Sequence, residues 1–236
     1  MGALIARIRR ELKKNASAKV RDSGRRFFKE KVKLHGVRTP AVNAIAKKYY
    51  SEIKDKDKDE ILRICEDLWR SGYMEESFIA CRWSYCIRKK FEPKDFRVLE
   101  QWVMHHLDNW ASCDTLCNHT VGAFLELYPD HLPRLKKWAR SGNRWARRAA
   151  AVSLIVPARK GIFMRECIEI ADILLNDGDD LVQKGYGWLL KSASRTHERE
   201  IFEYVMSRRA VMPRTALRYA IETISPDLKA RAMEKA

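Results

Sequence analysis

Hydrophobic positions along this chain recur at the spacing of α-helices almost from end to end. Apolar side chains return every three or four residues, whereas the alternation of a strand and the Asn-Gly turn of a hairpin are nearly absent. Thr39-Pro40 has the composition of a helix start, and Asn176-Asp177-Gly178-Asp179 has that of a loop. The pattern predicts an all-α protein.

The predicted helices cover residues 3–14, 17–35, 40–51, 57–71, 75–91, 95–107, 110–128, 131–141, 144–157, 161–175, 179–194, 197–208, 213–223 and 226–235. They pair, and the second helix of successive pairs begins near 75, 110, 144 and 179, in steps of 35, 34 and 35 residues. A regular period of this size indicates an α-solenoid of HEAT, armadillo or TPR type. We predict a single HEAT-like repeat domain over residues 1–236; an irregular helical domain is the alternative.

Repetition has a geometric consequence, because equivalent positions of stacked helices line up across one surface. Asp114, Arg148 and Lys184 are 34 and 36 residues apart, so we expect them in a row on adjacent helices. If the second helix of each pair lies on the inner side, the row lines a basic concave face that contains one carboxylate.

The charge of the chain is strongly positive and unevenly distributed. Its 47 Lys and Arg residues outnumber 31 Asp and Glu residues, for a net charge of +16. Residues 1–50 hold fifteen Lys or Arg and three acids, and residues 131–165 hold ten Lys or Arg and no acid. Such clustering is typical of a surface that binds phosphates. A solvated basic face is the alternative.

Other classes of site and location are less well supported by the residues. No apolar run has the length of a membrane span, and the apolar N-terminal stretch is too short for a secretory signal, so we expect a cytoplasmic or nucleoid-associated protein. We also expect a monomer, as is common for a solenoid with capped ends. The six cysteines contain no Cys-x-x-Cys pair. We therefore expect buried free thiols rather than a metal site, and no cofactor.

Two helices place tryptophan beside positive charge. On 179–194, Trp188 lies off the core stripe, on the side that holds Lys184 and Lys191. It is either packed on the next repeat or exposed as a stacking platform for a base or sugar, with the lysines on phosphates. On 144–157, Arg148 borders the inward stripe, while Arg147 points away and is expected to be solvated.

A lone acid breaks this pattern. In the predicted helix from 110 to 128, Asp114 lies four residues after Trp110, at the edge of the apolar stripe. Asp114 has two structural explanations, an ion pair with Arg148 or a favourable place in the first turns of its helix. It could equally be a carboxylate kept for chemistry beside the aromatic ring, and the residues alone leave these alternatives open.

The ordered set of these motifs resembles a known family. In sequence order come Trp110 with Asp114 four residues later, the run Trp145-Ala146-Arg147-Arg148-Ala149-Ala150, and the run Gln183-Lys184-Gly185-Tyr186-Gly187-Trp188-Leu189-Leu190-Lys191. With the upstream turn Gly36-Val37-Arg38-Thr39-Pro40, they resemble the AlkD-like DNA alkylation-repair glycosylases over roughly residues 20 to 205. These are HEAT-like proteins that excise N3- and N7-alkylated purines from DNA.

The resemblance implies the parts of an active site. Asp114 would be the catalytic carboxylate, which stabilises an oxocarbenium-like sugar while the N-glycosidic bond is hydrolysed. Trp110 and Trp188 would form an aromatic cradle for the base, and Phe27 occupies the upstream aromatic position of the family. No metal is required by this chemistry.

The remaining predicted residues bind the DNA backbone. The resemblance implies Arg148 and Lys191 as backbone contacts, and we add Lys184 and Arg144 from the basic helix faces. The expected partner is double-stranded DNA with alkylated bases, and no membrane. Two other hypotheses stay open: a non-catalytic HEAT-like module that binds damaged or structured nucleic acid, and a protein-interaction scaffold.

Overall fold

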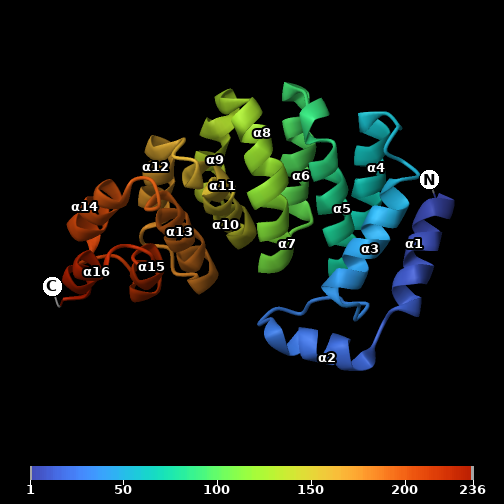
Figure 1. Ribbon diagram of the computed structural model, residues 1–236, viewed down its shortest axis with the longest axis horizontal. Helices are drawn as coiled ribbons and strands as arrows, with labels where there is room; N and C mark the ends of the chain where they lie inside the picture. The colour runs from blue at the N-terminus through green and yellow to red at the C-terminus, as the bar shows by residue number, and fades with distance from the viewer. Residues whose placement is uncertain (1, 235–236) are drawn as a thin grey trace. The chain divides into compact units, whose positions relative to one another are not determined.

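The computed structural model describes residues 2–234 and is helical nearly throughout (Figure 1). Within those residues the isolated bridge between Lys33 and Tyr73 is the one β pairing. The prediction of an all-α protein is therefore confirmed. The end of the last predicted helix, at 235, lies outside the described residues.

The α-helices are α1 (Gly2–Lys14), α2 (Ala18–Phe27), α3 (Thr39–Tyr50), α4 (Lys58–Trp69), α5 (Met74–Cys86), α6 (Phe96–His105), α7 (Trp110–Thr115), α8 (Gly122–Leu127), α9 (Leu132–Ala139), α10 (Arg144–Val152), α11 (Ile155–Arg159), α12 (Met164–Leu174), α13 (Asp180–Ala193), α14 (Glu198–Arg208), α15 (Arg214–Ala220) and α16 (Pro226–Met233). Short 3₁₀ turns cover Arg88–Lys90, Pro93–Asp95 and Pro129–His131, and Leu116–Val121 is a π-helix. The starts of α5, α7, α10 and α13 agree with the predicted repeat to within one residue.

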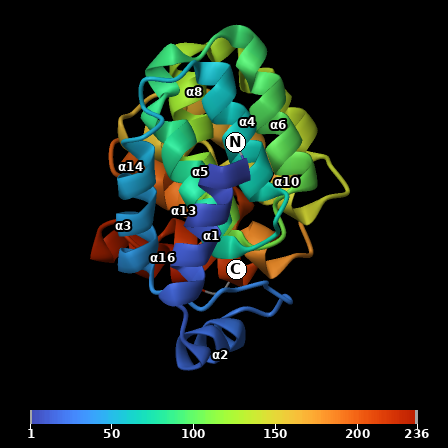
Figure 2. The same cartoon turned by 90° about the vertical axis from the view of Figure 1, so that its right-hand side faces the viewer.

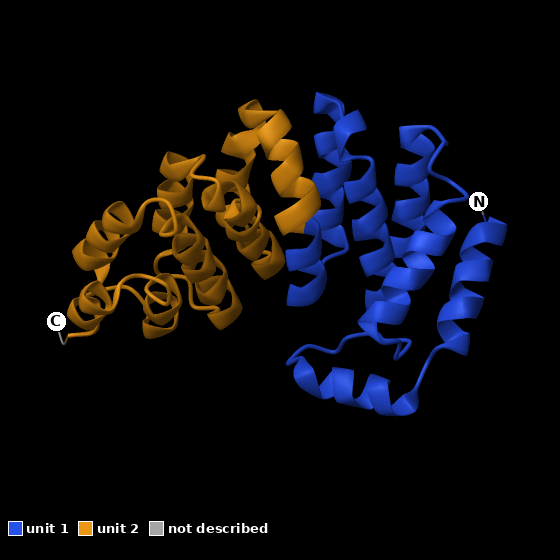
Figure 3. Cartoon of the chain, in the orientation of Figure 1, with its two compact units in different colours: residues 1–116 blue, residues 117–236 orange. Residues whose placement is uncertain are grey.

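The helices form two compact units, residues 1–116 and residues 117–236 (Figure 3). The prediction of a single repeat domain stays a prediction. In the described part of the chain, each helix is too short or too polar to cross a membrane.

In the first unit, neighbouring helices stack in a row through their apolar faces. Helix α5 packs on α3, α4 and α7, and α3 packs on α1. Trp83 of α5 is fully buried between these helices, and its indole Nε1 donates a 2.8 Å hydrogen bond to the carbonyl of Ala46 in α3. The backbone hydrogen bonds of each helix are made within that helix, so burial of side chains such as this ring holds the helices of the unit together.

Helix α2 stands apart from this core. It lies across the ends of α1 and α3 in both views (Figures 1 and 2), and none of its residues is buried. The predicted helix 17–35 was wrong beyond Phe27, because the chain continues there as an extended segment. Val32 and Leu34 are buried in this segment while Lys33 between them is exposed. That alternation is the strand-like signal that the helical prediction overlooked.

A buried carboxylate from α5 holds the end of the extended segment. The carboxylate oxygens of Glu75 accept hydrogen bonds from the backbone amides of His35, Gly36 and Val37, at 3.0, 2.8 and 3.1 Å. Gly36 has a φ of +89°, and a side chain there would lie 2.5 Å from the carbonyl oxygen of Ser17. Glycine is thus required for the amides to converge on one carboxylate.

A second buried acid lies next to the first. Glu76 is fully buried and accepts hydrogen bonds from His35 Nε2 at 3.0 Å and from Arg9 Nε at 3.0 Å. Burial on its own raises the pKa of Glu76, but the hydrogen bonds from His35 and Arg9 outweigh it and hold the pKa below its usual value. The two acids together join α1, the extended segment and α5.

In the second unit, helix α13 is the central element. It packs against α10, α11, α12 and α15. At Gly187 a side chain would lie 2.8 Å from the carbonyl oxygen of Ala216, so glycine permits the close approach of α15. The helix predicted over 144–157 is divided into α10 and α11, because Pro157 has no backbone N–H to donate to the carbonyl of Ser153.

We expect Glu75→Ala to destabilise the protein strongly. The variant leaves three backbone amides without their acceptor, and each buried donor without a partner costs about 1–3 kcal/mol, so the free energy of unfolding should fall by at least ~3 kcal/mol. Urea denaturation measures this. The matched control is Glu203→Ala, which removes an exposed acid of α14 paired with exposed Arg199 and should change stability by less than about 0.5 kcal/mol. Equal effects in the two variants would contradict the role of Glu75.

Candidate functional site

Helix α7 carries two of the predicted site residues, and its start is fixed by a side-chain cap. Asn109 precedes the helix in an extended conformation, and its side-chain oxygen accepts a 2.8 Å hydrogen bond from the backbone amide of Ser112. The hydroxyl of Ser112 lies 2.7 Å from that of Ser77 in α5. The cap therefore joins the first turn of α7 to the core of the first unit, which fixes the position of Trp110.

Trp110 is the centre of an aromatic cluster in the first unit. The ring of Phe28 stacks on it with a centroid distance of 5.3 Å, and the ring of Phe27 lies 5.7 Å away at a steep tilt. Phe27 is 71% exposed, the largest exposure among the big apolar side chains of residues 2–234. The structure thus brings the predicted Phe27 and Trp110 together. Phe28, which the sequence did not single out, makes the closer contact.

Asp114 lies one turn beyond Trp110 on the same short helix and is half-buried. A carboxylate with no exposed surface could not contact a sugar of bound DNA, whereas Asp114 is partly exposed to solvent. Its helix leads directly into the π-helix Leu116–Val121. Such π-helical turns are rare and are frequent at functional sites. The first unit therefore carries the half-buried carboxylate of Asp114 one turn from Trp110, and the exposed ring of Phe27 lies beside the same tryptophan.

In the second unit, Arg148 is held against α13. It is only 6% exposed, and its Nη1 donates a hydrogen bond to the carbonyl oxygen of Leu181. Its aliphatic stem lies beside Gly185, where an added side chain would come within 3.4 Å of Cγ. The predicted neighbourhood of Arg148 with the helix of Lys184 is confirmed. The predicted contact of Arg148 with DNA stays a prediction.

The other predicted DNA-binding residues each pair with a carboxylate of the second unit. The ion pairs are Arg144 with Asp179 at 2.8 Å, Lys184 with Asp180 at 3.1 Å, and Lys191 with Glu222 at 2.6 Å. The sequence did not reveal these partners, because two of the three lie about 30 or more residues away. A phosphate would have to compete with these acids for the three cations.

Arg147 also differs from its expected state. It was expected to be a solvated charge, but its Nε lies 2.6 Å from a carboxylate oxygen of Asp177, and the Asp177 side chain is almost wholly buried. The two residues join α10 to the loop before α13. Arg147 therefore has a structural partner within the second unit.

Trp188 has neighbours that the sequence did not predict. It is half-buried on α13, and the guanidinium carbon of Arg159, at the end of α11, lies 5.9 Å from the centre of its ring. Desolvation and the charge of Arg195 lower the pKa of Arg159. Desolvation and the charge of Arg159 lower the pKa of His119. Arg159, which lies over the Trp188 ring, thus has two further groups near it, Arg195 and His119, that bear or can bear positive charge.

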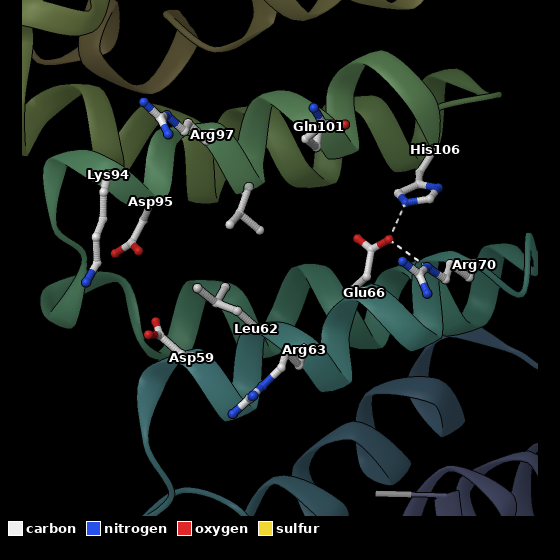
Figure 4. A pocket seen from close by; sticks show the side chains of 11 residues that line it. Asp59, Leu62, Arg63, Glu66, Arg70, Lys94, Asp95, Arg97, Gln101 and His106 are labelled. Atoms are coloured by element: carbon white, nitrogen blue, oxygen red, sulfur yellow. Dashed lines mark hydrogen bonds and ion pairs between the residues drawn. The ribbon is translucent and has the colours of Figure 1, made fainter.

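A pocket of about 650 Å³ lies between α4 and α6 of the first unit, and none of the predicted site residues lines it (Figure 4). Leu62 and Val98 form part of its wall. At one end, Glu66 accepts hydrogen bonds from Arg70 at 2.9 Å and His106 at 3.0 Å. The charged side chains at this end of the pocket therefore bind one another, which gives them a structural role.

The six cysteines are free thiols, and five of them are buried as expected, whereas Cys86 is exposed. Burial raises the pKa of Cys65 and of Cys167, so both thiols stay protonated at neutral pH. Among residues 2–234, no three His, Cys, Asp or Glu side chains are grouped as metal ligands would be.

We expect His119 to titrate below the usual histidine pKa and to respond to its cationic neighbour. Replacing Arg159 with alanine removes one of the two causes that lower the pKa of His119, so the pKa should rise in Arg159→Ala. Chemical shifts of the His119 ring followed by NMR over pH measure both values. Arg165→Ala, which removes an exposed arginine paired with Glu169, should leave the value unchanged. The same pKa in wild type and Arg159→Ala would contradict the proximity.

Comparisons with known proteins agree with the fold. The family model of DNA alkylation repair enzymes matches residues 8–224. A solved structure described as a predicted DNA alkylation repair enzyme from Enterococcus faecalis superposes with a TM-score of 0.80 at 17% identity, over 90% of this chain and 98% of that one. A search of curated proteins finds no match. The structural likeness confirms the predicted HEAT-like α-solenoid fold class, and the family match over nearly the whole chain shows that this protein belongs to the DNA alkylation repair enzyme family.

Proposed function

We propose that this protein is a DNA glycosylase that excises positively charged N3- or N7-alkylated purines by hydrolysing the N-glycosidic bond. The observation that carries the proposal is the half-buried Asp114 on a short capped helix whose first residue, Trp110, lies beside the exposed ring of Phe27. Membership of the DNA alkylation repair family supports the choice of substrate.

The chemistry asks little of the protein beyond one anion. An N3- or N7-alkylated purine already bears positive charge, so it leaves as a neutral base and needs no proton from a general acid. As the bond from the sugar C1′ to the purine nitrogen breaks, positive charge develops on the sugar. The carboxylate of Asp114 stabilises this charge and positions a water molecule, which bonds to C1′ and releases its proton to the carboxylate or to solvent.

Aromatic rings supply selectivity for the damaged base. The faces of tryptophan and phenylalanine attract a cationic base through the ring quadrupole, by about 1–2 kcal/mol per ring when water is excluded. Trp110, Phe27 and Phe28 lie within one cluster of the first unit. A neutral, unmodified purine lacks this attraction. The base can therefore be chosen by its charge, without hydrogen bonds to its edge.

The proposed backbone contacts are Arg144, Arg148, Lys184 and Lys191, all in the second unit. Three of them are held in ion pairs with carboxylates. Ion pairs of this kind are worth about 0–1 kcal/mol when they are exposed, so a phosphate can take over the cation at small cost. In the free protein, the same carboxylates keep the cations in place.

We expect Asp114→Asn to lower the rate of base release by a factor on the order of 10²–10³, while binding of the same DNA stays nearly unchanged. Asparagine keeps the size of the side chain but not the charge that stabilises the sugar. The measurement is release of free methylated purines from methylated duplex DNA, with binding measured separately. Asp172→Asn, on α12, is a control that should retain full activity, since Asp172 pairs with Arg208 and Tyr204.

Two results would overturn this assignment in different ways. Full activity of Asp114→Asn would remove Asp114 from catalysis but leave the proposed reaction standing. No release of base by the wild-type protein, together with tight binding to methylated DNA, would instead favour a non-catalytic module for damaged DNA.

Phe27 offers a test that separates function from folding. Because Phe27 is 71% exposed, Phe27→Ala should change the free energy of unfolding by less than about 0.5 kcal/mol. Loss of one cation–π contact of ~1–2 kcal/mol should still slow base release by about five- to thirtyfold. Tyr219→Ala, which removes an exposed ring of the second unit, is the matched control. Wild-type release by Phe27→Ala would exclude Phe27 from substrate binding.

A further inference from the structure

We propose that Arg159 and Arg195 form a clamp for a phosphodiester group of DNA beside Trp188. The clamp rests on the proposed DNA-binding function and adds a site that the sequence did not indicate. It lies wholly within the second unit, at the end of α11 and in the turn after α13.

The two turns that carry the arginines are joined by hydrogen bonds. The hydroxyl of Thr196, next to Arg195, donates a 3.3 Å hydrogen bond to the carbonyl oxygen of Ala158, next to Arg159. The turn that contains Gly161, at a φ of +75°, comes within 3.4 Å of the His197 ring nitrogen through its carbonyl oxygen. The backbone therefore fixes the bases of both side chains relative to each other.

No acidic side chain pairs with the guanidinium groups of Arg159 and Arg195 within residues 2–234. In this described part of the chain, the guanidinium groups of Arg159 and Arg195 make no hydrogen bond or ion pair, and both residues are exposed. Neighbouring cations do find partners, as Lys160 does with Glu126 at 2.7 Å. The proximity of the two guanidinium groups is unfavourable in the free protein, since like charges repel. An anion between them removes this repulsion.

The chemistry of the side chains selects a phosphodiester. A guanidinium group binds two phosphate oxygens at once, and two of them can hold one phosphate from both sides. The ring of Trp188 lies beneath the guanidinium group of Arg159 and helps to hold it in place. The same ring offers an apolar surface to the sugar or base attached to the phosphate. Arg159 and Arg195 are thus free for DNA at once, whereas Arg144, Lys184 and Lys191 must first leave a carboxylate.

The salt dependence of DNA binding tests the clamp. Each phosphate contact that is lost lowers the slope of log Kobs against log salt by about 0.9. For unmodified duplex DNA, we expect Arg159→Ala and Arg195→Ala each to weaken binding on the order of tenfold near 0.1 M salt. Each single variant should also reduce the slope by about one, and the double variant should reduce it by up to two. Arg159→Lys, which keeps the charge, should retain the slope. Thermal unfolding checks that every variant is folded.

Arg199→Ala is the matched control, because it removes an exposed arginine of the same unit that pairs with Glu203 at 3.0 Å. It should leave both affinity and slope close to wild type. If Arg159→Ala and Arg195→Ala behave like this control while the wild type binds DNA steeply, the clamp is wrong and the proposed DNA-binding function survives. A wild-type protein with no salt-dependent DNA binding overturns both.

A last measurement separates DNA from a free nucleotide. The clamp is proposed for a backbone phosphate, so titration with dAMP at micromolar concentrations should show no binding to the wild type. Micromolar binding of dAMP that is lost in Arg159→Ala would assign the two arginines to a mononucleotide and overturn the DNA assignment. Base release by variants that have lost the clamp remains a separate test of Asp114.

Discussion

One buried carboxylate governs the form of the first unit. Glu75 gathers three consecutive backbone amides of the segment that joins α2 to α3, and these amides could find no other acceptor in the core. The end of this segment is therefore held in a non-helical conformation, and α2, with Phe27 at its end, precedes it. The capped start of α7 places Trp110 at the other side of the aromatic cluster. The positions of the Phe27 ring and the Asp114 carboxylate thus depend on hydrogen bonds that nearby backbone amides make to the side chains of Glu75 and Asn109.

The second unit handles charge in two ways. Arg144, Lys184 and Lys191 have carboxylate partners, which hold them in place and reduce the net positive field around them. Arg159 and Arg195 have neither a partner nor much shelter. In a protein of net charge +16, the distribution of acids therefore matters more than the number of bases. The positions of the acids determine which cations are available to an anion directly and which must first leave a carboxylate.

Local signals in the sequence predicted most of the helices and only part of the site. The starts of α7, α10 and α13 follow from Asn109, Asn143 and Asp179, which cap helices within three residues of themselves. Trp110 and Asp114 could be placed on one helix for the same reason. The course of the backbone at residues 35–37, by contrast, depends on Glu75, which lies 38 to 40 residues away along the chain. The carboxylate partner of Arg147, Asp177, and the neighbour of Arg159, Arg195, also come from distant turns, which helical periodicity cannot indicate.

The lack of any buried residue in α2 has a consequence for how such proteins change over time. The exposed positions of this helix, Phe27 among them, can vary with little loss of stability, whereas a side chain at Gly24 would lie 2.8 Å from buried Leu34. The stacked helices tolerate less variation, since a residue such as Gly187 of the second unit has no room for a side chain. The exposed surface of α2 can therefore diverge while the framework stays the same.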